Sequence, residues 1–190
     1  MVQRELVAEA ERERKRLCDE DWIEAAIQGL LSEGPSGLRI ARLARALGVT
    51  PGSFYWHFRG RDELRDRVLQ HWRDQMLRGA AAAVQMSGRG AEQIRALPGI
   101  LVARRLPDLD AAMRAWSGHD AVVASAVASA DELRLRMVAA MFREAGLDDP
   151  CAQQRAKILW WVFRGSSGAD ESERLCAFRH IIEALLHDAE

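Results

Sequence analysis

Residues 37–64 carry the clearest pattern of hydrophobic and polar positions in the chain. The apolar residues that recur at helical intervals and share one face are Ile40, Leu43, Ala44 and Leu47. Gly48 follows them, and glycine readily adopts the left-handed conformation that ends a helix. A second short helix is predicted over residues 51–58, because Thr50 suits its N-cap and Pro51 its first position. Together the two helices and their tight turn predict a helix-turn-helix.

The predicted second helix divides into an inner and an outer face. Phe54 and Phe58 are four residues apart and share the inner face. The outer face and its flanks carry Gly52, Ser53, Tyr55, Trp56 and His57. Small residues allow the backbone to approach DNA, while hydroxyl, imidazole and indole groups can meet phosphates or base edges in a major groove. The alternative is a solvated pair of helices whose aromatic residues are ordinary core.

Charge around the helix-turn-helix favours a nucleic-acid partner. No acidic residue occurs between Glu33 and Asp62, whereas five arginines do. The whole chain has a formal net charge of −1, so this local exclusion of carboxylates is a property of the segment. A surface that faces phosphates requires such an exclusion.

The stretch A-R-A-L-G-V-T-P-G-S-F-Y-W-H-F-R-G-R-D-E-L, residues 44–64, resembles the DNA-binding signature of TetR-type transcriptional regulators. The resemblance is strong over about residues 21–69 and much vaguer afterwards. Many family members carry lysine or another polar residue where this chain has Pro51. The resemblance implies DNA contacts from Arg39, Thr50, Gly52, Ser53, Tyr55, Trp56, His57 and Arg61.

Composition predicts an all-α protein. The chain has 190 residues, 48% of them hydrophobic and 29% charged, with only five prolines. No apolar run reaches the length of a membrane span, and three widely spaced cysteines argue against a disulfide framework. A reducing cytoplasm fits this cysteine usage. We expect a DNA-binding domain with an N-terminal arm over residues 1–69, followed by a helical domain over residues 70–190 for which the resemblance implies ligand binding and dimerisation.

Helical periodicity extends along most of the chain. A first helix is expected from Asp21 to near Gly34, and a long one from Asp62 to about Met86. Five more are expected over residues 91–105, 108–118, 119–145, 149–165 and 171–188, with Pro98-Gly99 kinking or dividing the first of these. Residues 1–20 read either as a solvated helical extension, in which Glu11 pairs with Lys15, or as an arm that reaches DNA.

Aromatic and sulfur-containing residues of the second half are candidates for a ligand cavity. Such side chains commonly line small-molecule pockets, although at helical spacing a single residue of this kind is more often plain core. The predicted ligand-binding residues are Trp72, Met76, Met113, Trp116, His119, Met137, Met141 and Trp160.

Apolar stripes on the last two predicted helices are candidates for a homodimer interface. A single recognition helix reads only a few base pairs, whereas two copies related by a two-fold axis read a palindrome. The predicted interface residues are Leu159, Phe163, Leu175, Phe178, Ile182 and Leu185. Alternatively, these stripes close the core of the monomer.

An enzymatic or metal-binding role finds little support. The chain lacks a glycine-rich phosphate loop, a nucleophile elbow and a Cys-x-x-Cys pair. The most metal-like set spans about 16 Å along one helix, too far for one ion, which leaves only a metal shared across a dimer; it consists of Cys176, His180, Glu183 and His187. No catalytic residue, metal or cofactor is therefore expected.

The sequence predicts a cytoplasmic, homodimeric, DNA-binding transcriptional regulator. We expect it to bind a palindromic operator in double-stranded DNA and to repress until a small-molecule effector releases it. The alternatives are a helical enzyme or metal-binding module in the second half, and a regulator controlled by a protein partner instead of a small ligand.

Overall fold

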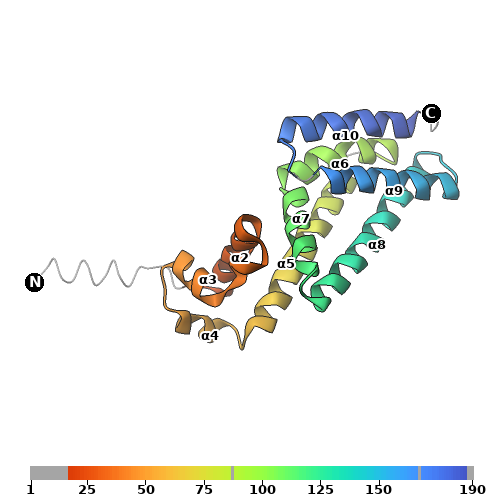
Figure 1. Cartoon of the computed structure of the whole chain (residues 1–190). Coiled ribbons are helices and arrows are strands. Elements are labelled where there is room, and N and C mark those ends of the chain that lie inside the picture. The colour runs from red at the N-terminus through yellow and green to blue at the C-terminus, as the bar shows by residue number, and fades with distance from the viewer. Residues whose placement is uncertain (1–16, 87, 167, 188–190) are drawn as a thin grey trace, which may run out of the picture.

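The computed structural model describes residues 17–86, 88–166 and 168–187, and every regular element within these ranges is helical. Figure 1 shows the helices in order along the chain. They are α2 (Asp19–Glu33), α3 (Ile40–Leu47), α4 (Phe54–His57), α5 (Arg61–Met86), α6 (Ala91–Ala103), α7 (Leu106–Ser117), α8 (Ala121–Glu144), α9 (Asp149–Gly165) and α10 (Glu171–Leu186). Two 3₁₀ turns, η1 (Gly34–Leu38) and η2 (Pro51–Ser53), flank α3. The all-α fold predicted from the sequence is confirmed.

Aspartate side chains fix where three of the later helices begin. Asp120 Oδ1 accepts hydrogen bonds from the backbone N–H groups of Val122 and Val123 at the start of α8. At the starts of α9 and α10, Asp148 accepts from the N–H of Cys151 and Asp170 from the N–H of Glu173. An aspartate at the N-cap satisfies backbone donors that the helix itself leaves without a partner.

Helix α6 is not divided at Pro98-Gly99, which was one of the two outcomes that the sequence allowed. It is one helix from Ala91 to Ala103 with Pro98 inside it. Pro98 is buried, as are Ile94 and Leu97 on the preceding turn. Packing of this apolar face offsets the loss of the backbone hydrogen bond that proline cannot donate, because most helix stability in proteins comes from tertiary contacts.

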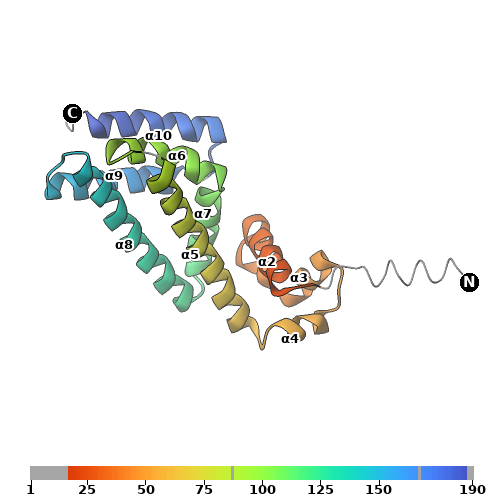
Figure 2. The same cartoon turned by 180° about the vertical axis from the view of Figure 1, so that it is seen from behind.

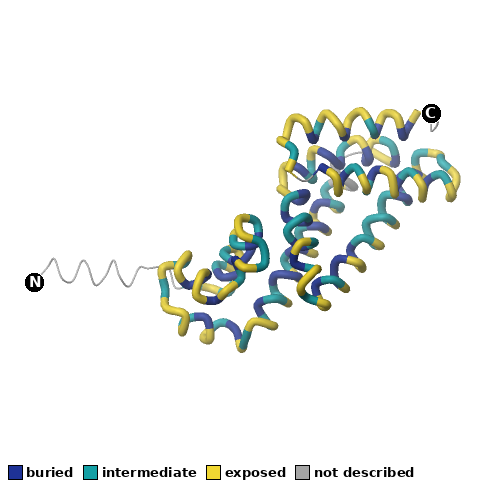
Figure 3. Tube along the Cα trace, viewed as in Figure 1, coloured by how far each residue is buried: buried dark blue, intermediate teal, exposed yellow. Residues whose placement is uncertain are grey.

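The buried residues form two hydrophobic clusters. Figure 3 marks the buried positions along the chain in dark blue. The first joins α2, α3 and α4 to the first part of α5, to α7 and to the first part of α8. The second joins α6, the last part of α8, α9 and α10. The first cluster contains residues on both sides of residue 69, so the segments before and after this residue share a core. The domain boundary near residue 69 stays a prediction.

Helix α5 connects the two ends of the molecule. Figures 1 and 2 show α2, α3 and α4 at one end and α6, α9 and α10 at the other, with α5 running between them. The final helix α10 packs on α6 and α9. In the described part of the chain, no helix has the length and apolar character needed to cross a membrane.

Two glycines allow α2 to pack closely on the turn before α3. A Cβ atom on Gly37 would overlap the backbone carbonyl of Gly29. Gly37 is buried, and η1 passes directly over α2 at this point. The position of α3, and with it the whole helix-turn-helix, therefore depends on the absence of a side chain at residue 37.

Candidate functional site

The turn of the helix-turn-helix forms as the sequence predicts. Gly48 ends α3 in the left-handed conformation with φ of 69°, and the N–H of Val49 donates to the carbonyl of Ala44 at 2.9 Å. A Cβ atom on Gly48 would meet nothing within 4 Å, so the backbone conformation is what favours glycine here.

The recognition segment is less regular than the single helix expected over residues 51–58. It begins as the 3₁₀ turn η2, in which the Ser53 N–H donates to the Thr50 carbonyl at 3.0 Å, and continues as α4 from Phe54 to His57. The Thr50 side chain makes no capping hydrogen bond, contrary to the role we predicted for it. Because Pro51 fixes φ and lacks an N–H group, the tight turn forms here without that cap.

Aromatic packing sets the rotation of the recognition segment. Phe54 and Phe58 are fully buried, with ring centroids 5.2 Å apart, as predicted for the inner face. Trp22 of α2 meets Phe54 edge-on at 5.4 Å. The opposite face consequently projects into solvent, where Trp56 is 89% exposed and Tyr55 is 65% exposed. Large aromatic side chains held this far from the core form a surface suited to contact with another molecule.

His57 has a partner inside the chain. Its Nδ1 lies 2.9 Å from Oδ1 of Asp19, and its side chain is only 19% exposed. Arg67 of α5 approaches the other oxygen of Asp19 at 3.8 Å. The resemblance implied a DNA contact for His57; in the free chain its imidazole ties the recognition segment to the start of α2. No sequence pattern indicated this pairing, because the two residues lie 38 positions apart.

Exposed arginines occur before and after the recognition segment in the chain. Arg39 lies at the N-cap of α3 and Arg61 at the start of α5, and both side chains are exposed. Arg42 pairs with Glu33, the last residue of α2. Among the described residues no carboxylate pairs with Arg39 or Arg61. These two charges are therefore available to phosphate oxygens.

Helix α5 contacts α8 at two points. Near its start, Arg65 contacts Asp62 at 3.0 Å and Asp120, the N-cap of α8, at 3.6 Å. Desolvation opposes the charge of Arg65, but its hydrogen bond with Asp66 and the neighbouring carboxylates outweigh this and raise its pKa. Further along, the fully buried Trp72 lies 5.3 Å from the guanidinium carbon of Arg134 of α8.

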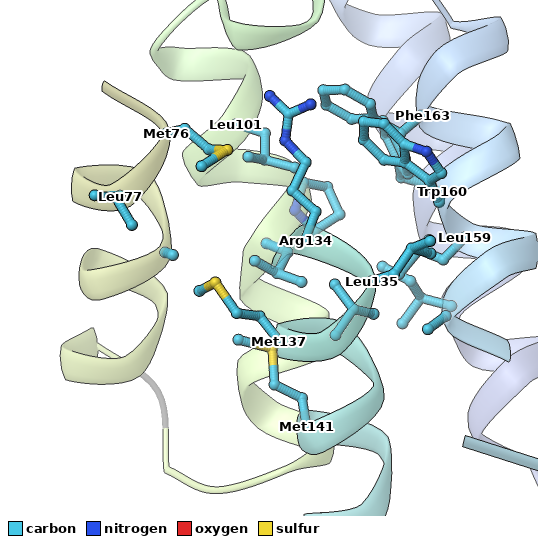
Figure 4. Close-up of a pocket in the computed structure, with 17 residues that line it drawn as sticks. Met76, Leu77, Leu101, Arg134, Leu135, Met137, Met141, Leu159, Trp160 and Phe163 are labelled. Carbon is cyan, nitrogen blue, oxygen red and sulfur yellow. The ribbon is translucent and has the colours of Figure 1, made fainter. Parts of the chain in front are cut away.

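A cavity lies among α5, α6, α8, α9 and α10 (Figure 4). Four of the predicted ligand-binding residues line it, namely Met76, Met137, Met141 and Trp160. The other four do not. Trp72, Met113 and Trp116 belong to the first hydrophobic cluster, and His119 is exposed between α7 and α8. Periodicity could not separate the cavity residues from Trp72, Met113 and Trp116, because all of them lie on apolar faces of their helices and only packing shows which face borders the cavity.

Most of the residues predicted for the dimer interface are buried within the single chain, as in the alternative in which they close the core of the monomer. The buried ones are Leu159, Phe163, Phe178, Ile182 and Leu185, whereas Leu175 is half-buried. They pack in the second hydrophobic cluster because α10 lies against α9 and α6 of the same chain. The apolar side chains that α9 does expose are Trp161, at 64%, and Ile158, at 37%. The adjacent pair Trp160-Trp161 could have indicated this exposure in the sequence. Neighbouring residues of a helix point about 100° apart, so the two tryptophans face different directions.

The metal-like residues of α10 have other contacts. Cys176 Sγ and His180 Nδ1 lie 3.6 Å apart on the exposed side of the helix, and His180 Nδ1 also donates to the Cys176 carbonyl at 2.8 Å. Glu183 pairs with Arg95 of α6 at 3.1 Å, and this hydrogen bond lowers the pKa of Glu183. Within the described residues, no three His, Cys, Asp or Glu side chains are grouped to hold a metal ion.

Taken together, the left-handed turn at Gly48, the inward phenylalanines and the exposed recognition face define a helix-turn-helix protein with an all-helical second half. Residues 23–68 match the profile of a family described as bacterial regulatory proteins, tetR family. This segment is therefore similar to the DNA-binding part of tetR-family regulators, as the sequence resemblance indicated.

Curated relatives match about a third of the chain. Over 66 residues it is 39% identical to the HTH-type transcriptional regulator SrpR of Pseudomonas putida. It is 36% identical over 66 residues to the uncharacterized HTH-type transcriptional regulator TtgW, also of Pseudomonas putida. The matched segment is 35% of this chain but only 29% of the length of SrpR and 46% of that of TtgW.

Solved structures match nearly the whole fold. A transcriptional regulator from Rhodococcus sp. Rha1 superposes with a TM-score of 0.73 at 19% identity, covering 91% of this chain and 96% of the other. A TetR-family transcriptional regulator from Streptomyces coelicolor gives a TM-score of 0.70 at 23% identity, covering 90% and 88%. At such identities the likeness establishes the fold, including that of the second half, and leaves ligands and partners open.

Proposed function

We propose that this protein is a DNA-binding transcriptional regulator that recognises duplex DNA through α4 and the turn before it. The observation that carries the proposal is the exposed face of α4. Trp56 is 89% exposed and Tyr55 is 65% exposed, while Phe54 and Phe58 hold that face outward. The match to the tetR-family profile supports the same role for residues 23–68.

In this arrangement some residues position the protein on the duplex, and others read the base sequence. Arg39 and Arg61 bind phosphates on either side of the recognition segment, which fixes its register on the duplex. Ser53 and Trp56 face the base edges, and the small Gly52 allows the backbone to come close. Thr50 and Tyr55 add contacts with the DNA at the edge of this surface. His57 supports this surface from behind through Asp19.

The regulator acts as a homodimer on a palindromic operator. Two recognition segments with half-sites about 34 Å apart give the specificity that one cannot. The exposed Trp161 and Ile158 on the outer face of α9 support an interface at this end of the molecule. This interface replaces the buried residues that the sequence analysis favoured.

A small effector releases the operator in this proposal, so that the protein is a repressor. The cavity bordered by α5 supports an effector site, because α5 also carries Arg61 and Arg65 at the DNA-binding end. A ligand that binds one orientation of α5 more tightly than the other shifts the distance between the two recognition segments.

Selection from a random duplex library, followed by a salt titration of the selected site, tests the proposal. We expect a palindromic consensus and an affinity that falls steeply as salt rises. Failure to enrich any sequence, or binding without salt dependence, would refute it.

A further inference from the structure

The cavity among α5, α6, α8, α9 and α10 is lined almost entirely by apolar side chains. Its volume is about 90 Å³, and its described lining side chains are aliphatic, aromatic or thioether groups apart from Arg134. Arg134, Met137 and Met141 are three and four residues apart, so they line one face of α8. Figure 4 shows the Arg134 guanidinium beside Trp160 and Phe163 at one end of the cavity, with Met137 and Met141 toward the other.

The positive charge of Arg134 is already compensated. Its Nη2 lies 2.6 Å from Asp110 Oδ1, an ion pair without hydrogen-bond geometry, and its Nη1 lies 3.2 Å from Asp131 Oδ1. Arg114 completes the group by donating from Nε to Asp110 at 2.9 Å and from Nη1 to Asp131 at 2.8 Å. Two guanidinium groups and two carboxylates cancel, so no net charge faces the cavity.

The carboxylates of this network hold Arg134 in place. Asp110 is buried, with 3% of its side chain exposed. Desolvation acts against the charge of Arg114, but the hydrogen bond with Asp131 and the charges of both aspartates raise its pKa. An anionic ligand could engage Arg134 only by drawing it from Asp110, which would leave a buried carboxylate with less compensation.

Aromatic rings cover the guanidinium of Arg134. Its central carbon, Cζ, lies 4.9 Å from the ring centroid of Trp160, 5.3 Å from that of Trp72 and 5.9 Å from that of Phe163. These are the ring faces that a cationic ligand would use. A ligand cation would therefore find these ring faces already occupied by the guanidinium of Arg134.

We infer that the cavity takes an uncharged, apolar molecule of about the size of one substituted aromatic ring. A polar or charged ligand would lose its hydration and find no matching free group. An apolar ligand loses little, and the flexible side chains of Met76, Met137 and Met141 can repack around it. This inference rests on the proposed function only in treating the cavity as the effector site.

The test uses three probes of one shape: neutral 4-fluoroanisole, anionic 4-fluorobenzoate and cationic 4-fluorobenzylammonium. Each is titrated into the full-length protein without DNA, and binding is followed by fluorine NMR and by the resonances of ¹³C-methyl-labelled methionines. We expect 4-fluoroanisole to shift the signals of Met76, Met137 and Met141 in a saturable manner and to leave that of Met113 unchanged, since Met113 lies outside the cavity. The charged probes should bind at least ten times more weakly.

Two variants locate the site. Met137→Trp adds bulk to the cavity wall and should reduce 4-fluoroanisole affinity at least tenfold, whereas Arg136→Trp adds the same side chain on the exposed side of α8 and should leave it unchanged. Equal or tighter binding of either charged probe at the same methionines overturns the inference, as does the absence of saturable 4-fluoroanisole binding. Since no DNA is present, neither result bears on operator binding, which the library selection tests separately.

Discussion

His57 Nδ1 lies 2.9 Å from Asp19 Oδ1, so the last residue of the recognition helix α4 is bound to the first residue of α2. The pair brings a carboxylate close to a surface that we propose to bind phosphates. Asp19 is also 3.8 Å from Arg67, so it contacts side chains from two other helices. A carboxylate in this place serves to position α4, because its charge by itself opposes DNA binding.

Asp19→Asn separates these two effects. Removing a negative charge near DNA should raise affinity if Asp19 acts only through its charge. If it positions α4 through His57, we expect affinity for the selected operator to fall about three- to tenfold, in keeping with the loss of about 1 kcal/mol from one charge-assisted hydrogen bond. Glu20→Gln makes the same charge change at the next residue, and serves as the control. Tighter binding by Asp19→Asn would contradict the positioning role.

Arg61→Ala and Trp56→Ala should differ in what they change. Loss of a phosphate contact at Arg61 should weaken binding to all sequences and lower the salt slope by about one unit. Loss of the Trp56 indole should cost about 1–3 kcal/mol on the preferred site, with a smaller effect on unrelated duplexes. Fluorescence anisotropy at several salt concentrations measures both. An unchanged salt slope for Arg61→Ala would count against its contact with phosphate.

Gly37→Ala and Gly52→Ala test two different uses of glycine. A methyl group at residue 37 would overlap the backbone of Gly29, so Gly37→Ala should destabilise the fold by about 1–3 kcal/mol. At Gly52 a Cβ atom would meet only Thr50 Oγ1, at 3.7 Å, so the fold should tolerate alanine. Operator affinity should still fall, since the added methyl group would keep the backbone from the DNA. Urea unfolding and DNA titration of both variants check this contrast, which would be absent if both glycines served only the fold.

Trp161→Glu tests the interface proposed on the outer face of α9. Placing a carboxylate where the indole is 64% exposed should disrupt association and leave the 21.3 kDa monomer folded. Val122→Glu alters another exposed apolar residue, on α8, and should leave the dimer intact. Sedimentation at micromolar concentration distinguishes the two variants. A wild-type monomer that still binds a palindrome tightly would disprove the dimer.

Asp110→Asn tests the buried ion-pair network beside the cavity. Arg134 and Arg114 would lose their shared carboxylate in a site where the Asp110 side chain is 3% exposed, and stability should fall by about 3 kcal/mol. Glu132→Gln removes an ion pair with Arg136 at 3.7 Å whose side chains are 73% and 67% exposed, so less than about 0.5 kcal/mol should be lost. Chemical denaturation measures both changes. Equal losses would mean that the network contributes no more than a surface pair.

Local signals in the sequence determined the helices and the recognition turn. Periodicity placed most of the helices within a few residues of their observed bounds, and Gly48 ended α3 through its own left-handed backbone conformation. The inward orientation of Phe54 and Phe58 followed from their spacing alone. Each of these features depends on residues within one or two turns of a helix, so a linear pattern contains the information.

Only the tertiary structure decided which partner each face would have. The apolar stripe containing Phe178 and Ile182 suits a second chain and a neighbouring helix equally well, and packing of α10 on α6 and α9 buried it within the monomer. Packing likewise placed Met137 at the cavity and Met113 in the other core, although both lie on apolar faces. The pairing of His57 with Asp19 joins residues 38 positions apart. Hydrophobic burial is non-directional, so a sequence pattern shows that a face will be covered, while the arrangement of the helices determines what covers it.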